Sequence, residues 1–174
     1  MATIPIKIYG DPTLRKKAAP ISSIGEHIGS LVDRMIQTMY ASEGAGLAAP
    51  QVGESIALIV LNLSAISGDD SDTAQATALV NPEIRESRGE CVHEEGCLSV
   101  PDIREDVIRP EEILVSFEDM EGRRRELTCD GMLARVIQHE VDHLNGVLFV
   151  DRISPLKRQL LRGKLKKMAK RNGT

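Results

Sequence analysis

The pattern of apolar and polar residues along the chain predicts an amphipathic helix and, after it, a buried strand. Apolar residues recur at helical spacing between Ile24 and Met39, with polar residues at the other positions. Ser23 and Glu26, three residues apart, predict a capping box at the start of this helix. Residues 56–63 then form a continuous apolar run of strand length, which is typical of a strand buried on both faces.

The remaining pattern predicts shorter strands around a second helix. Residues 64–77 are rich in Ser, Asp, Gly and Thr and predict a surface loop. Three short strand signals follow, at residues 78–80, 113–117 and 123–127. A hairpin turn at Glu121 and Gly122 would join the last two of them. Residues 130–145 have helical periodicity, and Gly146 is a natural stop. The buried face of this helix is expected to hold five apolar residues: Met132, Leu133, Val136, Ile137 and Leu144.

Strands on both sides of a central helix predict an α+β fold, and we expect residues 1–174 to form a single domain. Hydrophobic residues make up 41% of the chain and aromatic residues only 2%, so the core must consist mainly of Leu, Ile, Val, Ala and Met. No secretory signal and no apolar run of membrane-spanning length is visible. Three cysteines, an odd number, predict reduced thiols in the cytoplasm rather than structural disulfides.

Residues 152–174 differ from the rest of the chain in charge. They hold nine of the 22 basic residues and no acidic residue, whereas the preceding part has thirteen basic against 26 acidic residues. A helix docked by one apolar stripe is expected here, because five apolar residues fall near helical spacing: Leu156, Leu160, Leu161, Leu165 and Met168. Its basic outer face either contacts RNA or is a solvated surface that balances an acidic body.

The second predicted helix carries the sequence His139-Glu140-Val141-Asp142-His143, an HExxH motif. Residues four apart lie on one face of a helix, so both imidazoles can bind a single metal ion. Glu140 would then lie beside the open position of the metal, where a water needs a base. Histidines that are merely packed or solvated are the simpler alternative. Asp142 either fixes a basic group near the site or is a solvated helix residue.

The motif leaves the third metal ligand open. The elaborated motif HExxHxxGxxH would need a histidine where the chain has Phe149, and no Asp or Glu follows Arg152. Both common completions therefore fail, and the third ligand must precede the motif. Besides carboxylates, four side chains there can bind a metal: Cys91, His93, Cys97 and Cys129. Spacing alone does not choose among them.

Three stretches of the chain resemble the signature motifs of peptide deformylases. They are Gly44–Gln51 (GAGLAAPQ), Glu95–Ser99 (EGCLS) and Gln138–Gly146 (QHEVDHLNG). Their order and spacing match as well, and the similarity extends over nearly the whole chain, including Ser154–Lys157. The resemblance implies mainly antiparallel β-sheets packed around a central metal-binding helix, with a C-terminal basic helix.

The resemblance also implies which residues form the site. In that family the cysteine of the second motif is the third metal ligand, which implies Cys97 together with His139 and His143. Gln51 and the backbone N–H of Leu98 would hold the oxyanion. A neutral carboxamide suits this role, because it stabilises the charge of a tetrahedral intermediate without binding the substrate as an ion.

Substrate binding can be predicted in part. By resemblance, the backbone of Gly46 would hold the peptide in an extended, strand-like pose. We expect an apolar pocket for methionine, with three lining residues close to the ligands: Ala45, Met132 and Val136. Arg104 either contacts the substrate backbone or is an ordinary surface arginine. His93 lies at the pocket entrance or, as we prefer, elsewhere on the surface.

The resemblance implies a hydrolase that removes the formyl group from the N-terminal formyl-methionine of nascent polypeptides and releases formate. One divalent metal ion is expected, with Fe²⁺ favoured, and Zn²⁺, Ni²⁺ or Co²⁺ also suit two imidazoles and a thiolate. The basic helix is then expected to contact the ribosome near the exit tunnel. Two alternatives are a metallopeptidase that cleaves internal bonds and a metal-stabilised RNA-binding module. The module would need neither Glu140 nor an open coordination position.

Overall fold

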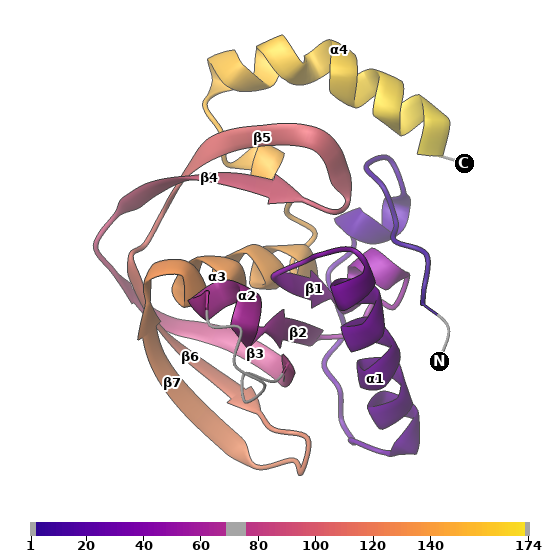
Figure 1. Cartoon of the computed structure of the whole chain (residues 1–174), viewed down its shortest axis with the longest axis vertical. Helices are drawn as coiled ribbons and strands as arrows, with labels where there is room; N and C mark the ends of the chain where they lie inside the picture. The colour runs from indigo at the N-terminus through magenta and orange to yellow at the C-terminus, as the bar shows by residue number, and fades with distance from the viewer. Residues whose placement is uncertain (1–2, 69–75, 173–174) are drawn as a thin grey trace.

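The computed structural model describes residues 3–68 and 76–172. Its largest element is an antiparallel sheet of five strands in the order β1-β2-β3-β6-β7 (Figure 1). The bounds of these strands are Gly46–Ala48 for β1, Leu58–Asn62 for β2, Ala76–Arg88 for β3, Glu112–Glu118 for β6 and Arg124–Asp130 for β7. The α+β fold expected from the sequence is confirmed.

Strand β2 is buried on both faces, as its continuous apolar run predicts. Leu58 and Val60 pack in one cluster with helix α1 (Glu26–Ala41), while Ile59 and Leu61 pack in another with helix α3 (Gly131–Leu144). All four side chains are almost completely excluded from solvent. The sheet therefore separates two helices, with α1 on one face and α3 on the other. Helix α3 carries two of the predicted metal ligands, His139 and His143.

Helix α1 has the predicted apolar face but not the predicted cap. Its N-cap is Gly25, which makes no side-chain capping hydrogen bond. Ser23 lies two residues before this cap, so the capping-box prediction is wrong. The buried positions agree with the expected stripe and include Leu31 and Met35.

Helix α3 agrees closely with the predicted range of 130–145, with Asp130 at its N-cap and Asn145 at its C-cap. Gly146 follows with φ +71°, and a Cβ there would lie 2.6 Å from the carbonyl oxygen of Arg15. The predicted buried face needs one correction. Met132 is 41% exposed, because the first turn of α3 lies beside an open pocket instead of in the core.

A two-stranded hairpin, β4 (Cys91–Cys97) and β5 (Val100–Arg109), lies across α3 from the large sheet (Figure 1). Neither strand is predicted by the pattern of the sequence. Buried positions of this hairpin are occupied by Glu95 and Arg109, so the usual alternation of apolar and polar residues is broken. The hairpin predicted at Glu121 and Gly122 is confirmed, since it joins β6 to β7.

Part of the loop predicted for residues 64–77 is regular structure. A short helix, α2, spans Leu63–Ser67, and β3 already begins at Ala76. Residues 69–75 lie outside the described residues. Three 3₁₀ helices complete the connections: Pro12–Arg15, Ala49–Val52 and Phe149–Asp151.

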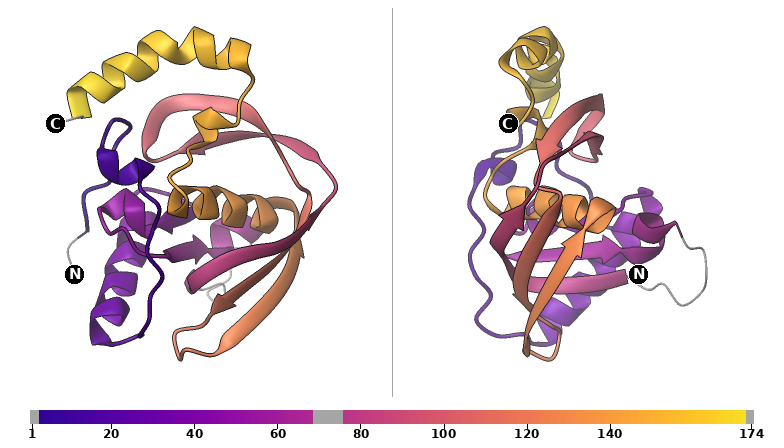
Figure 2. Two further views of the ribbon diagram at one scale, coloured as in Figure 1. Left: turned by 180° about the vertical axis from the view of Figure 1, so that it is seen from behind. Right: turned by 90° about the vertical axis from the view of Figure 1, so that its left-hand side faces the viewer.

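Helix α4 (Pro155–Asn172) lies over the hairpin, on the side away from the five-stranded sheet (Figure 2). The helix packs on an apolar cluster that includes Val100, Ile103 and Val107 of β5. Its contributions to this contact are Leu161, Leu165 and Met168. Leu156 and Leu160 are 68% and 77% exposed, so the docked stripe is narrower than predicted. Within the described residues, no helix is long and apolar enough to cross a membrane.

Candidate active site

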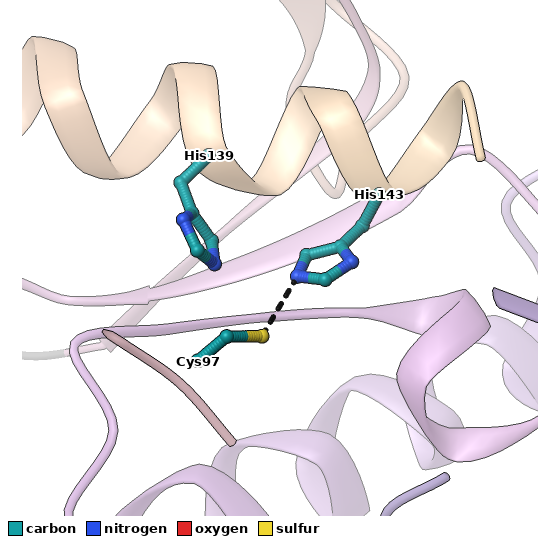
Figure 3. A group of neighbouring side chains, drawn as sticks. All are labelled: Cys97, His139 and His143. Atoms are coloured by element: carbon teal, nitrogen blue, oxygen red, sulfur yellow. Dashed lines mark hydrogen bonds between the residues drawn. The ribbon is translucent and has the colours of Figure 1, made fainter. Parts of the chain in front are cut away.

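The fold brings Cys97, at the end of β4, to the face of α3 that carries His139 and His143 (Figure 3). Their ligating atoms all lie within 4.8 Å of one another, and Cys97 Sγ is 3.3 Å from His143 Nε2. Among the residues that the structure describes, these form the only cluster of three or more His, Cys, Asp or Glu side chains suited to a metal ion.

The chemistry of this cluster fits a divalent metal. Its donor set is one sulfur and two imidazole nitrogens, a combination suited to first-row transition metals. His139 Nδ1 is 2.9 Å from Glu95 Oε2, which leaves the other ring nitrogen of His139 for the cluster. Burial, reinforced by nearby His139, holds the pKa of His143 well below its ordinary value, so this imidazole is neutral, as a metal ligand must be.

Glu140 is buried beside these ligands. Burial raises the pKa of its carboxyl group to about 7, although His139 and Arg109 oppose the shift. Its Oε2 atom is buried and has no hydrogen-bond partner among the described residues. A carboxylate with a pKa near the working pH and an unused oxygen is suited to act as a general base.

Gly46 allows β1 to approach this carboxylate. A Cβ at Gly46 would lie 2.7 Å from Glu140 Oε1 and 2.9 Å from Val136 Cγ1, closer than real Cβ contacts. A side chain at this position would therefore push aside the side chains of Glu140 and Val136 or displace β1. The need for glycine here is a matter of space and not of backbone angle.

Gln51 lies in the 3₁₀ helix after β1 and is almost completely buried. Its Oε1 accepts a hydrogen bond from the backbone N–H of Ala48 at 2.8 Å, which fixes the orientation of the carboxamide. Its Nε2 therefore points to Ser99 Oγ at 3.2 Å and to Cys97 Sγ at 3.6 Å. A neutral N–H donor is thus held beside the cluster, and Leu98 directly follows the cysteine.

A pocket of about 460 Å³ opens in front of the cluster. Its lining includes all the residues predicted to take part in catalysis or substrate binding: Ala45, Gly46, Gln51, Leu98, Arg104, Met132, Val136 and Glu140. Arg104 is largely exposed and pairs with Glu94 at 2.8 Å. His93 is exposed and lies in the lining of the pocket.

A buried ionic network stands behind the ligands. Glu95 accepts hydrogen bonds from Arg109 at 2.6 and 3.0 Å and from Arg135 at 2.6 Å, in addition to its contact with His139. Burial alone would raise the pKa of Glu95, but His139 and Arg109 hold it far below its ordinary value. Asp142 is buried and binds both Arg109 and Arg152, so it fixes basic groups near the site.

The sequence analysis missed the arginines of this network. Glu95 stands within the second motif, but Arg109 and Arg135 follow no local pattern that would single them out. Arg109 meets Glu95 through the pairing of β4 with β5, and Arg135 meets it because the hairpin folds across α3. A buried carboxylate next to a metal ligand needs cationic partners, and this requirement was the one available signal.

Comparisons with known proteins agree with this geometry. A family sequence model described as polypeptide deformylase matches residues 3–159. A peptide deformylase of Thermodesulfovibrio yellowstonii is 47% identical over 166 residues, which cover 95% of this chain and 98% of that protein. The crystal structure of a peptide deformylase from Legionella pneumophila has a TM-score of 0.86 and 44% identity, and the match covers 95% of each chain.

The fold and the cluster together define a class of α+β hydrolases in which a helical HExxH and a strand cysteine gather around a metal site. Within that class, the chain belongs to the peptide deformylase family. It is a hydrolase that removes the formyl group from the N-terminal formyl-methionine of nascent polypeptides, with release of formate.

Proposed function

We propose that Cys97, His139 and His143 hold the divalent metal ion on which the deformylase reaction of this chain depends. The observation that carries this proposal is their convergence within 4.8 Å, next to the unpartnered oxygen of Glu140. Fe²⁺ is favoured by resemblance to the family. Zn²⁺, Ni²⁺ and Co²⁺ are compatible with the same donors.

Glu140 is the proton carrier of the reaction. When bound, the metal ion supplies Lewis acidity, which lowers the pKa of water towards neutrality. Glu140 takes a proton from the attacking water and later returns it to the departing amine, which becomes the free N-terminus of the methionine. Its raised pKa and its position next to His139 support both steps.

Gln51 and Leu98 stabilise the negative charge that develops on the formyl oxygen. The Gln51 Nε2 donor is oriented before the substrate arrives, because Ala48 holds the opposite end of the carboxamide. The backbone N–H of Leu98 is the second donor, and it follows the ligand cysteine directly. Preorganised donors of this kind stabilise the transition state without reorganisation.

The pocket in front of the cluster binds the formylated peptide. The backbone of Gly46 on β1 pairs with the peptide main chain, and β1 lies at an edge of the sheet, where a further strand can add. Ala45, Met132 and Val136 form the apolar wall for the methionine side chain. Arg104, at the rim, contacts the substrate backbone.

One assay tests this assignment against the metallopeptidase alternative. Anaerobically prepared protein is analysed for metals and then incubated with formyl-Met-Ala-Ser, and both formate and peptide fragments are measured. We expect one metal ion per chain, formate in proportion to substrate consumed, and an intact Met-Ala-Ser product. Cleavage between the amino acids, or turnover that does not follow metal content, contradicts the proposal.

Helix α4 is proposed to contact ribosomal RNA in the cytoplasm, as an extension of one domain spanning residues 1–174. Five basic residues of α4 are exposed and, among the described residues, have neither an acidic partner nor a side-chain hydrogen bond: Arg162, Lys166, Lys167, Lys170 and Arg171. Arg162, Lys166 and Lys170 are spaced four residues apart, so they form one stripe along the helix. Such a surface suits phosphate contacts that weaken steeply with salt.

Point substitutions test this contact better than truncation, because α4 is packed on the body through Leu161, Leu165 and Met168. The double variant Lys166→Glu and Lys170→Glu should lose co-sedimentation with ribosomes at low salt while formyl-peptide turnover stays unchanged. A matched control reverses two exposed basic residues on β3, Arg85→Glu and Arg88→Glu. Equal co-sedimentation of the α4 variant and this control counts against the ribosome contact.

A further inference from the structure

Helix α4 reaches the wall of the active-site pocket through one side chain. The Nζ atom of Lys164 donates a hydrogen bond to the backbone carbonyl of Asp102. Asp102 and its neighbour Ile103 belong to β5 and line the pocket. The lysine therefore acts on the main chain of the pocket wall and is separated from it by 62 residues in sequence.

Asp102 lies at a point where this wall needs support. Its φ of +61° is in the left-handed region, which residues with a Cβ adopt at a cost and only where surrounding contacts maintain it. The pairing of β4 with β5 is also irregular at this end, with a register shift between Gly96 and Cys97. The hydrogen bonds between β4 and β5 therefore do not by themselves fix the backbone of Asp102. The hydrogen bond from Lys164 to the Asp102 carbonyl supplies the additional support.

Apolar packing places α4 firmly enough to provide this support. Leu165 is buried in the same cluster as Ile103, and Leu161, Met168 and the ligand Cys97 pack against that cluster. Lys157 forms an ion pair with Glu105 on β5 at 2.8 Å. The helix thus also contacts β5 at two positions beyond the left-handed residue.

A second contact fixes the far end of α4. Gly10 has φ +110°, and a Cβ there would lie 2.6 Å from the Cα of Ala169, so the N-terminal segment abuts the helix backbone. The neighbouring Tyr9 N–H donates to the carbonyl of Ser99 at 2.8 Å. The position of α4 is therefore set relative to the turn that joins β4 to β5.

We propose that Lys164 is a positioning residue for substrate binding. By holding the carbonyl of Asp102, it keeps the β5 wall of the pocket in place for the peptide. The inference rests on the proposed pocket, and it holds whether or not α4 contacts the ribosome.

Three variants of the metal-loaded full chain test this role. Lys164→Met keeps the aliphatic stem and removes the donor, Lys164→Arg restores a donor, and Lys166→Met removes the same charge from an exposed position two residues away. With formyl-Met-Ala-Ser, Lys164→Met should raise KM about three- to tenfold, the value of one hydrogen bond, with kcat changed less than about twofold. Metal content should stay at the wild-type value, and the other two variants should resemble wild type.

Two results overturn the inference. One is a KM for Lys164→Met equal to that of Lys166→Met. The other is a loss of metal, or a fall in kcat with unchanged KM, because α4 would then support the fold or the ligands and not the pocket wall. Val136→Phe in the otherwise wild-type chain tests the pocket separately. An unchanged KM in that variant contradicts the pocket itself, and the role of Lys164 with it.

Discussion

At the scale of single residues, the site depends on charges and spaces that only particular side chains satisfy. Among the described residues, Cys97 is the one cysteine of the three that lies in a cluster of potential metal ligands. Burial, with a contribution from Asp130, raises the pKa of Cys129 to about 11, so this thiol stays protonated at neutral pH. A metal binds the thiolate form of cysteine. Substitution of Cys97 and substitution of Cys129 should therefore have different effects on metal binding.

Cys97→Ala should therefore lose both bound metal and activity, whereas Cys129→Ala should keep the metal stoichiometry of the wild type. Elemental analysis of anaerobically prepared protein measures the first property, and formate release measures the second. Cys91→Ala, on the same strand as Cys97, is a second control. A full metal complement in Cys97→Ala would refute the proposed ligand set.

Glu140 and Gln51 should be separable from the ligands by their effects. Glu140→Ala should retain metal and turn over about 10²–10⁴ times more slowly, the usual worth of a positioned proton carrier. Gln51→Ala should retain metal and lose about 10²–10³ in rate, since one oxyanion donor disappears. The exposed Glu83→Ala on β3 controls for loss of a carboxylate. Near-normal turnover by the Glu140 variant would exclude it as the proton carrier.

At the scale of elements, the site is built where the β4–β5 hairpin crosses α3. The helix supplies two of the proposed ligands and the proposed base, and the hairpin supplies the proposed cysteine ligand together with Glu95, whose carboxylate contacts His139. The two elements are joined by buried ion pairs from Glu95 to Arg135 and from Arg109 to Asp142. Such pairs contribute little net stability when whole, but loss of one partner leaves a buried charge unpaired.

Glu95→Gln should consequently be costly in two ways. We expect unfolding free energy to fall by about 3–5 kcal/mol, because buried Arg135 loses its carboxylate partner and buried Arg109 keeps only Asp142. Metal affinity should fall by about 10- to 100-fold, because His139 loses its orienting partner. Glu94→Gln is a matched control from the adjacent, exposed position, where an ion pair is worth at most about 1 kcal/mol. Denaturant unfolding measures the change in unfolding free energy, and metal titration measures the change in affinity. Equal effects of Glu95→Gln and Glu94→Gln would contradict the proposed role of the buried ionic network.

The elements with regular apolar patterns were predictable from the sequence. Residues 56–63 contain β2 and residues 130–145 contain α3, since each has a continuous or periodic apolar pattern. Strands β4 and β5 were missed because polar residues such as Glu95 occupy their buried positions. Local pattern also could not select the third ligand. Cys97 and the two histidines are more than forty residues apart and meet only through the hairpin crossing.

At the scale of the whole molecule, Asp151 links three distant parts of the chain. Its carboxylate contacts Arg15 in the first 3₁₀ helix and Arg158 in α4, and it accepts a hydrogen bond from the Leu148 N–H. Burial would raise the pKa of Asp151, but the contacts with Arg15 and Leu148 outweigh it and hold the pKa below its ordinary value. The N-terminal segment, the segment that follows α3, and α4 are thus joined through one ionised group.

This linkage predicts a dependence of stability on acid. Because the folded-state pKa of Asp151 is lowered, its contribution is fully present above the ordinary aspartate pKa of about 3.9 and is lost as pH falls through the lower folded-state value. The difference in thermal midpoint between wild type and Asp151→Asn should therefore be largest near neutral pH and shrink in acid. Asp33→Asn, at an exposed position on α1, controls for the loss of one carboxylate. A difference that stays constant from neutral pH to strong acid would contradict this account.

The docking of α4 has a consequence for the order in which the molecule can assemble. All three proposed ligands precede α4 in the chain, so a translating ribosome completes the hairpin and α3 before it makes the helix that covers them. Until Leu161, Leu165 and Met168 emerge, the apolar cluster around Ile103 lacks the part of its cover that α4 supplies. During that interval the three proposed ligand side chains can already come together, but the chain exposes an apolar surface to other nascent chains. Synthesis of the last helix therefore both finishes the pocket wall and closes the period in which the protein is most prone to aggregate.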